Sequence, residues 1–319
     1  MSILEVRDLG VAFGPIHPLS GVNFSIKKGE TLGIVGESGS GKSLTAMSIM
    51  GLLPLFGGRI TSGSINFDGQ DLTKLTDRAW RKLRGGRIGL ITQNPMTSLN
   101  PLQKIGPQVD EVAILHLGMS RAQARTRTVE ILGTLRIPEP EATCNRYPHQ
   151  MSGGMKQRIV IAMALAAKPD ALIADEPTTA LDVTVQAQII RLLDDLVKKR
   201  DLALVLITHD MSVIAQTCDK VVVMYAGRAI EQGPVATIFE SPHHPYTQAL
   251  IGCIPHGLAE NERLNRIKGT VPTVMNYPKG CPFHPRCPRA ATICSTTQPQ
   301  FASVGESSAA CHFVIGDAS

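Results

Sequence analysis

The sequence predicts an α/β fold, and three observations lead to that class. Short apolar runs rich in β-branched residues, which are typical of buried strands, alternate with helical stretches along the chain. One such run, at 31–35, leads directly into a glycine-rich loop and then into a helical stretch at 44–50. Another run, at 171–174, ends in two adjacent carboxylates. We therefore expect a sheet whose strand ends carry the polar loops of a binding site.

The N-terminal residues predict an antiparallel sheet that leads into the glycine loop. Strands are expected at 3–9, 22–26 and 31–35, with a tight turn at 27–30. Phe13 falls on the connection after the first strand, where its ring can stack on a purine base or serve as an ordinary core side chain.

The glycine loop at 36–43 has the pattern G-x-x-x-x-G-K-S between a strand and a helix. Glycines allow consecutive backbone N–H groups to turn inward at a helix N-terminus, which makes an anion site. In this pattern the lysine reaches the β- and γ-phosphates and the last hydroxyl binds Mg²⁺. A turn that only joins strand to helix is the alternative, and the coincidence of all these residues disfavours it. The expected nucleotide-binding residues are Gly36, Ser38, Gly39, Ser40, Gly41, Lys42 and Ser43.

The next segment carries a strand, a basic helix and a second polar strand end. A strand at 64–67 closes in an Asp-Gly turn, and a basic helical stretch covers 73–86. The buried strand at 88–91 delivers Gln93 to the sheet edge, where its amide can touch a metal ion or an attacking water. By itself, a glutamine at this position is also compatible with a simple loop residue.

A helical pattern then continues from 106 to 167. Ser120 is expected to cap a helix that runs to about 135. Ser152, Gly153 and Gly154 open another helix, and a hydroxyl with bare N–H groups at a helix start is again an anion site.

The two carboxylates after 171–174 predict the catalytic centre. Successive residues point in opposite directions, so Asp175 can hold Mg²⁺ while Glu176 orients and deprotonates the attacking water. A long amphipathic helix follows Asp182, and a strand at 202–207 is followed by Thr208 and His209. This imidazole is placed to contact a γ-phosphate, although a structural histidine would also fit.

The composition limits which classes of protein the chain can belong to. Of 319 residues 43% are apolar, and the net charge of +5 comes from scattered residues, which gives no reason to expect a nucleic-acid partner. No run of about 18 apolar residues could span a bilayer, and the first residues lack a secretion signal. We therefore expect a cytosolic chain whose seven cysteines do not form a disulfide framework.

With these motifs in this order, the sequence resembles the ATP-binding cassette family of transporter ATPases over about residues 1–240. The resemblance implies a P-loop fold with a RecA-like core sheet, an antiparallel β subdomain and a helical signature subdomain at about 94–165. It also implies that two ATP molecules, with Mg²⁺, lie between two facing ATPase domains. Ser152, Gly153 and Gly154 would then bind the γ-phosphate held by the partner's phosphate loop.

The same resemblance assigns roles to four further residues. Gln93 would couple to the membrane subunits and bind Mg²⁺ along with Ser43 and Asp175. Asp182 would lie in the loop that crosses the dimer interface, His209 would be the switch histidine, and Phe13 would stack on adenine. Met155 stands where the family commonly has glutamine, but the serine and backbone donors are retained, so we expect activity to survive.

Three segments resemble the peptide and nickel importer branch of that family: 93–101, 152–158 and 243–250. This implies an ATP-hydrolysing subunit on the cytoplasmic face of a bacterial inner membrane, bound peripherally and driving uptake of dipeptides, oligopeptides or related small solutes. The implied partners are a second, non-identical ATPase subunit, two transmembrane permeases and an extracytoplasmic solute-binding protein. Alternatives are a nickel-complex importer, a soluble ATPase acting on nucleic acid or ribosomes, and a redox-regulated interaction module.

The residues at 241–319 predict a small irregular extension that is rich in Pro, His and Cys. Four cysteines are concentrated there: Cys281, Cys287, Cys294 and Cys311. They suit a metal clip, either Zn²⁺ or an iron–sulfur cluster, although unligated thiols are also possible. Zinc sites usually show paired C-x₂₋₄-C spacing, which is absent here. Resemblance to dipeptide importers with similar tails favours a [4Fe–4S] cluster.

Overall fold

The computed structural model describes residues 1–179, 181–254 and 266–314, and its backbone divides into two compact units. The first unit contains Met1, Lys27–Glu30 and Lys74–Leu206. The second contains Ser2–Ile26, Thr31–Thr73 and the described part of Ile207–Ser319. The expected boundary between an ATPase domain at 1–240 and an extension at 241–319 stays a prediction.

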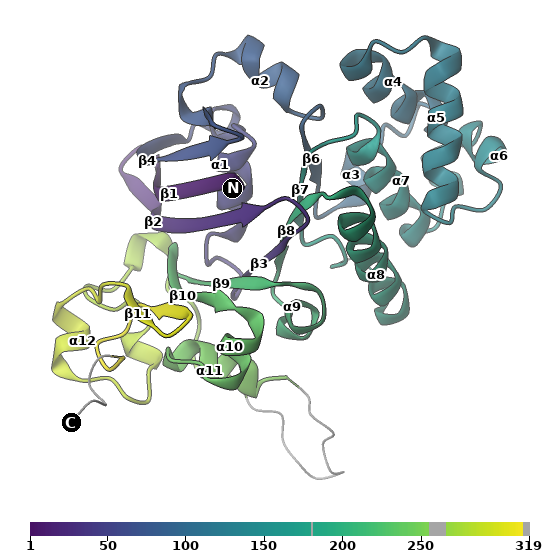
Figure 1. Cartoon of the computed structure of the whole chain (residues 1–319). Helices are drawn as coiled ribbons and strands as arrows, with labels where there is room; N and C mark the ends of the chain where they lie inside the picture. The colour runs from purple at the N-terminus through teal and green to yellow at the C-terminus, as the bar shows by residue number, and fades with distance from the viewer. Residues whose placement is uncertain (180, 255–265, 315–319) are drawn as a thin grey trace, which may run out of the picture. The chain divides into compact units, whose positions relative to one another are not determined.

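The second unit begins with an antiparallel sheet in the order β2-β1-β4-β5, of which β1, β2 and β4 are labelled in Figure 1. In β1 and β4, Leu4 pairs with Phe67 and Val6 with Ile65, and these four side chains are buried. Their alternation with polar neighbours places one face of the sheet in the core. The strands are β1 (Ser2–Phe13), β2 (Ile16–Lys27), β4 (Arg59–Phe67) and β5 (Gln70–Asp71).

The first strand is longer than the sequence predicted. The register between β1 and β4 shifts between Arg7 and Gly10, and Asp8 has a φ of 45°. This irregularity lets the strand bend and continue, whereas the polar residues at this point predicted its end. The expectation that Phe13 lies on a connection was therefore wrong, because Phe13 is the last residue of β1.

The second unit also holds strands in the order β11-β12-β10-β9-β3. β3 and β9 are parallel, with Ile34 opposite Val222, and the other pairs are antiparallel. The strands are β3 (Thr31–Val35), β9 (Lys220–Tyr225), β10 (Arg228–Pro234), β11 (Ala302–Val304) and β12 (Ser307–Ala309). The helices are α1 (Lys42–Ile49), α9 (Met211–Thr217), α10 (Val235–Glu240), α11 (Pro245–Gly252) and α12 (Thr292–Thr296).

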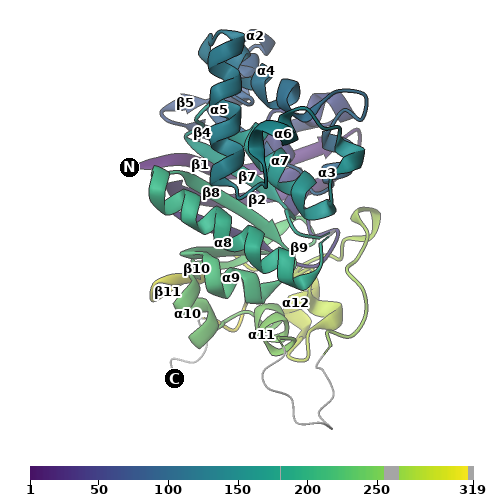
Figure 2. The same ribbon diagram turned by 90° about the vertical axis from the view of Figure 1, so that its right-hand side faces the viewer.

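The first unit contains strands β8-β7-β6 and most of the helices (Figures 1 and 2). β6 and β7 are parallel, and a Cβ atom at Gly89 would lie 2.8 Å from the carbonyl oxygen of Ala164, so α7 packs closely on this sheet. The strands are β6 (Ile88–Ile91), β7 (Ala171–Asp175) and β8 (Ala203–Thr208), of which the last two residues belong to the second unit. The helices are α2 (Asp77–Leu83), α3 (Pro95–Ser98), α4 (Ile105–Leu117), α5 (Arg121–Thr134), α6 (Pro140–Cys144), α7 (Gly153–Leu165) and α8 (Val183–Arg200).

The C-terminal residues contribute more structure than their composition predicted. β12 pairs with β10, with Glu231 opposite Ala309, so the chain end extends the sheet. Phe283 is buried with Tyr225 and Tyr246 in the same apolar cluster as β9. Within the described ranges, no helix is long and apolar enough to cross a membrane.

Candidate nucleotide-binding site

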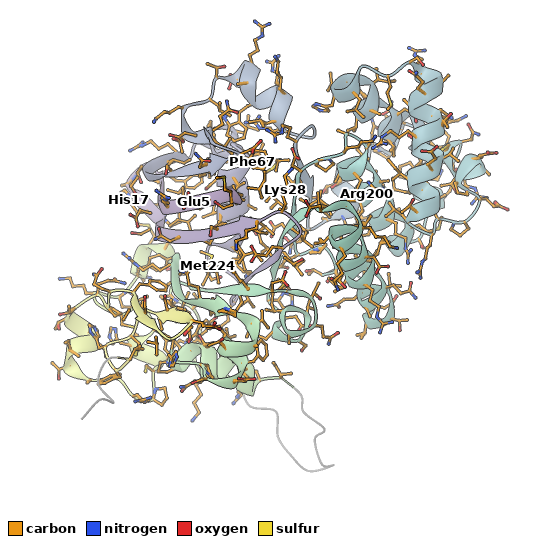
Figure 3. The ribbon with its side chains drawn as sticks, viewed as in Figure 1. Glu5, His17, Lys28, Phe67, Arg200 and Met224 are labelled. Atoms are coloured by element: carbon orange, nitrogen blue, oxygen red, sulfur yellow. The ribbon has the colours of Figure 1, made fainter. Side chains whose placement is uncertain are left out.

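The phosphate loop lies in the second unit, between β3 and α1. Gly36 admits no side chain, since a Cβ atom there would clash with the carbonyl oxygen of Met224 on β9 (labelled in Figure 3). Gly41 has a φ of 103°, in the region that glycine adopts without strain, and immediately precedes α1. The loop conformation therefore depends on glycine at both positions.

The N-terminus of α1 is open to an anion. The residue before the helix, Gly41, has no side chain to cap the first-turn N–H groups, which have no acceptor within the helix. Lys42 is only 5% exposed, and its Nζ donates to the carbonyl oxygens of Gly36 (2.7 Å) and Glu37 (3.0 Å). The Ser40 hydroxyl is buried and has no hydrogen-bond partner. An uncapped helix start and the unpaired Ser40 hydroxyl, beside the buried Lys42 cation, fit a polyphosphate.

The other candidate centre lies in the first unit, at the end of β7. Glu176 follows the strand with a φ of 46°, a left-handed conformation that is costly for a non-glycine residue. Its Oε2 atom accepts hydrogen bonds from Gln93 Nε2 (3.0 Å) and Thr179 Oγ1 (2.8 Å). The carboxylate is thereby held by two side chains from different loops.

The structure thus brings together Gln93 and Glu176 of the sequence-predicted residues, and it adds Thr179. Sequence reasoning passed over this threonine, although a hydroxyl three residues after a proposed general base was a usable signal. Asp175, the last residue of β7, lies in the same unit. Ser43, Phe13 and His209 belong to the second unit. The Mg²⁺ site of Ser43, Gln93 and Asp175 therefore stays a prediction.

The Ser-Gly-Gly stretch begins α7, as its sequence predicted. Ser152 is the N-cap, and its hydroxyl accepts from the N–H of Met155 at 3.3 Å. A Cβ atom on Gly154 would lie 2.7 Å from Val185 Cγ1, so this glycine permits the close approach of α8. Ser152 and Gly153 are exposed, which leaves this helix end available to a ligand.

The remaining predicted residues have local structural roles as well. Asp182 is the N-cap of α8, and its carboxylate accepts from the N–H of Val185 at 3.0 Å. Phe13 is half-buried, and its ring packs over Gly58, where a Cβ atom would lie 2.6 Å from the ring. His209 is exposed immediately after β8.

The four cysteines of the extension lie near one another in the structure. Burial raises the pKa of the Cys281 thiol to about 11. A hydrogen bond from the Phe283 N–H lowers this pKa, whereas the neighbouring thiols of Cys294, Cys311 and Cys287 raise it further. The N–H of Cys281 donates to the carbonyl oxygen of Cys294 at 2.8 Å. Among the residues that the structure describes, however, no group of three or more His, Cys, Asp or Glu is arranged to hold a metal ion.

A strand, a glycine loop and a helix with a buried lysine, together with a second strand that ends in two carboxylates, define a P-loop nucleoside triphosphatase. Comparison with known proteins narrows this class. The family model described as ABC transporter matches residues 19–179, and the one described as oligopeptide/dipeptide transporter, C-terminal region, matches residues 230–294. The chain therefore belongs to the ABC transporter family, as an ATPase of the oligopeptide/dipeptide branch.

Curated relatives align along nearly the whole chain. The oligopeptide transport ATP-binding protein AppD of Bacillus subtilis (strain 168) is 49% identical over 302 residues, covering 93% of this chain and 92% of AppD. The dipeptide transport ATP-binding protein DppD of Escherichia coli (strain K12) is 44% identical over 323 residues, covering 100% of this chain and 98% of DppD.

Solved structures share the fold. A dimeric post-hydrolysis state of the ATP-binding cassette MJ0796, bound to ADP and Pi, has a TM-score of 0.65 and 31% identity, covering 73% of this chain and 98% of MJ0796. CbiO1 from Clostridium perfringens, part of the ABC transporter complex cbiONQ, has a TM-score of 0.67 and 31% identity, covering 75% of this chain and 91% of cbiO1. The family and fold expected from the sequence are confirmed.

Proposed function

We propose that the chain is the ATP-hydrolysing subunit of a bacterial importer that takes up dipeptides or oligopeptides. The observation that carries this proposal is the match of both an ABC transporter model and a peptide-transporter C-terminal model within one chain. Curated relatives named as oligopeptide or dipeptide transport ATP-binding proteins support peptides over nickel complexes.

In this proposal the chain divides binding and catalysis between its loops. Lys42 exchanges the carbonyl oxygens of Gly36 and Glu37 for the β- and γ-phosphates. Glu176 accepts a proton from the attacking water, while Gln93 and Thr179 fix the direction of its carboxylate. Ser43 and Asp175 would hold Mg²⁺, which neutralises charge on the phosphates when bound. His209 would contact the γ-phosphate.

The assembly we propose contains a second, non-identical ATPase subunit, two permeases and an extracytoplasmic binding protein. The chain would sit on the cytoplasmic face of the membrane, bound to the permeases. Ser152, Gly153, Gly154 and Asp182 would then face the nucleotide held by the partner ATPase, and Phe13 would stack on adenine. The exposure of Ser152 and of Asp182 in the isolated chain supports these roles.

The test uses the whole complex in proteoliposomes, with labelled dipeptides, labelled oligopeptides and nickel as cargo. We expect ATP-dependent peptide uptake that Glu176→Gln nearly abolishes while ATP binding is retained. Uptake of nickel alone would favour the nickel importer instead. Undiminished hydrolysis by Glu176→Gln would refute the assigned base.

We also propose that Cys281, Cys287, Cys294 and Cys311 bind a [4Fe–4S] cluster, with Zn²⁺ as the alternative. Four thiols within one short extension support the proposal, and the N–H of Cys281 donates to the carbonyl oxygen of Cys294, which places two of the four cysteines side by side. The present positions of the thiols do not form a ligand set. Protein purified without oxygen should contain iron and acid-labile sulfide. Stoichiometric zinc without sulfide would favour the alternative, and neither metal would leave four free thiols.

A further inference from the structure

The C-terminal extension contacts Glu37, a residue of the phosphate loop. The carboxylate of Glu37 accepts two hydrogen bonds from the Arg286 guanidinium, one from Nη1 at 2.7 Å and one from Nη2 at 3.0 Å. The backbone N–H of Glu37 donates to the hydroxyl of Tyr246 at 2.9 Å. All three residues belong to the second unit. Residues of the C-terminal extension therefore bind both the side chain and the backbone of Glu37.

Arg286 is itself held firmly in place. Its Nε donates to the carbonyl oxygen of Lys268 at 2.8 Å, and Nη1 donates to the Tyr225 hydroxyl at 3.2 Å. The side chain is 6% exposed and lies over the rings of Tyr225 and Phe283. A planar guanidinium fixed in this way loses little further freedom when it binds a carboxylate.

The ion pair has an electrostatic consequence for the loop. Glu37 places a negative charge within the loop that would receive a triphosphate, and an unpaired carboxylate there would repel the ligand. Arg286 compensates that charge and draws the carboxylate onto the extension. Lys42 also donates to the carbonyl oxygen of Gly36 at 2.7 Å, and this carbonyl lies in the same planar peptide group as the Glu37 N–H. The Tyr246 bond to that N–H therefore also orients an acceptor of Lys42.

We propose that Arg286 and Tyr246 are positioning residues for the phosphate loop, through which the C-terminal extension sets the affinity of the chain for ATP. This inference rests on the proposed nucleotide site at 36–43. Neither residue touches the nucleotide in the proposal, and both act through Glu37.

The test measures the Kd for a fluorescent ATP analogue on the isolated chain, and KM and kcat for ATP on the complex. Arg286→Ala should raise Kd and KM roughly tenfold and leave kcat within about twofold, because the repelling charge acts on binding. Adding Glu37→Gln to Arg286→Ala should restore Kd to within about threefold of the wild type, since it removes that charge. A purely structural role of Arg286 would give no such rescue.

Three further variants complete the design. Tyr246→Phe, which removes only the hydroxyl, should raise KM about threefold. Arg289→Ala is the matched control, because Arg289 lies in the same extension, is exposed and contacts Phe313 instead; its Kd should equal that of the wild type. If Arg286→Ala does not fold, Arg286→Lys keeps the charge, and its Kd should weaken more steeply with added salt than that of the wild type.

The outcomes separate the two proposals. If Lys42→Ala binds ATP as tightly as the wild type, the nucleotide site is misassigned and the positioning role falls with it. If Lys42→Ala loses binding while Arg286→Ala keeps the wild-type Kd, only the positioning role is wrong. Equal loss in Arg286→Ala and in the double variant would also overturn it.

Discussion

Hydrogen bonds from two neighbouring side chains fix the direction of the Glu176 carboxylate. Its left-handed φ of 46° turns the chain sharply after β7, and Gln93 and Thr179 then share one oxygen as acceptor. A backbone strain of about 1–3 kcal/mol at such a site persists only where surrounding contacts hold it.

Thr179→Val should lower kcat about tenfold and leave KM for ATP nearly unchanged. The variant removes one hydrogen bond to a charged group, and a loss of about 1.4 kcal/mol in transition-state stabilisation is tenfold in rate. Steady-state hydrolysis by the assembled transporter measures the effect. Thr179→Ser keeps the hydroxyl and should retain most of the rate; equal rates for the Val and Ser variants would contradict this role.

His244 makes stability depend on pH in the acid range. Burial lowers the pKa of His244 to about 3, and its Nδ1 accepts from the Tyr246 N–H at 3.0 Å. The unfolded chain takes up this proton near pH 6.5, so the free energy of unfolding falls as the pH drops below that value, by about 2 kcal/mol at pH 5.

Urea unfolding at pH 7 and pH 5 tests this expectation. His244→Asn keeps an acceptor for the Tyr246 N–H but cannot titrate, so it should lose about 2 kcal/mol less than the wild type between the two pH values. The nearby Glu231, whose pKa burial raises, titrates with the opposite sign but is present in both proteins. Equal losses in both proteins would show that His244 does not contribute.

At the scale of elements, helix starts were the features most readily predicted. Ser120 and Ser152 cap α5 and α7, because their hydroxyls accept from N–H groups three residues later. Such bonds are local and are visible in sequence. The Arg286–Glu37 pair joins residues 249 positions apart, and no local pattern records it. The extra length of β1 escaped prediction for a related reason, since its irregularity is stabilised by pairing with β4.

The close packing of α7 on α8 predicts different effects for two adjacent glycines. A Cβ atom on Gly154 would lie 2.7 Å from Val185, whereas one on Gly153 would lie 3.5 Å from Leu181, an ordinary contact. Both substitutions to Ala gain the same helix propensity, so Gly154→Ala should be less stable than Gly153→Ala by about 1–2 kcal/mol. Urea unfolding of both variants measures the difference. Equal stability would mean that α8 adjusts freely.

At the scale of the whole molecule, the C-terminal extension shares an apolar cluster with β9 and with Val35, the residue of β3 that precedes the phosphate loop. Phe283 is 1% exposed, and its ring lies 5.3 Å from that of Tyr225 and 5.2 Å from that of Tyr246. Phe283→Ala should therefore lower the free energy of unfolding by about 3–5 kcal/mol. Phe301→Ala, at a ring that is 38% exposed, is the control and should cost far less. Similar unfolding midpoints for the two variants would show that the extension is energetically separate.

Strands β11 and β12 form one edge of the sheet that contains β9 and β10. β12 pairs with β10 at Glu231 and Gln232, which leaves the three-residue β11 as the outermost strand. A long unpaired strand recruits strands from other molecules, whereas a very short one offers them little. A chain that stops at residue 300 should therefore form large particles in light scattering, at concentrations where the full chain does not. Before the β11–β12 hairpin has formed, β10 is an uncovered edge strand, and formation of that hairpin removes this edge from reach of other molecules.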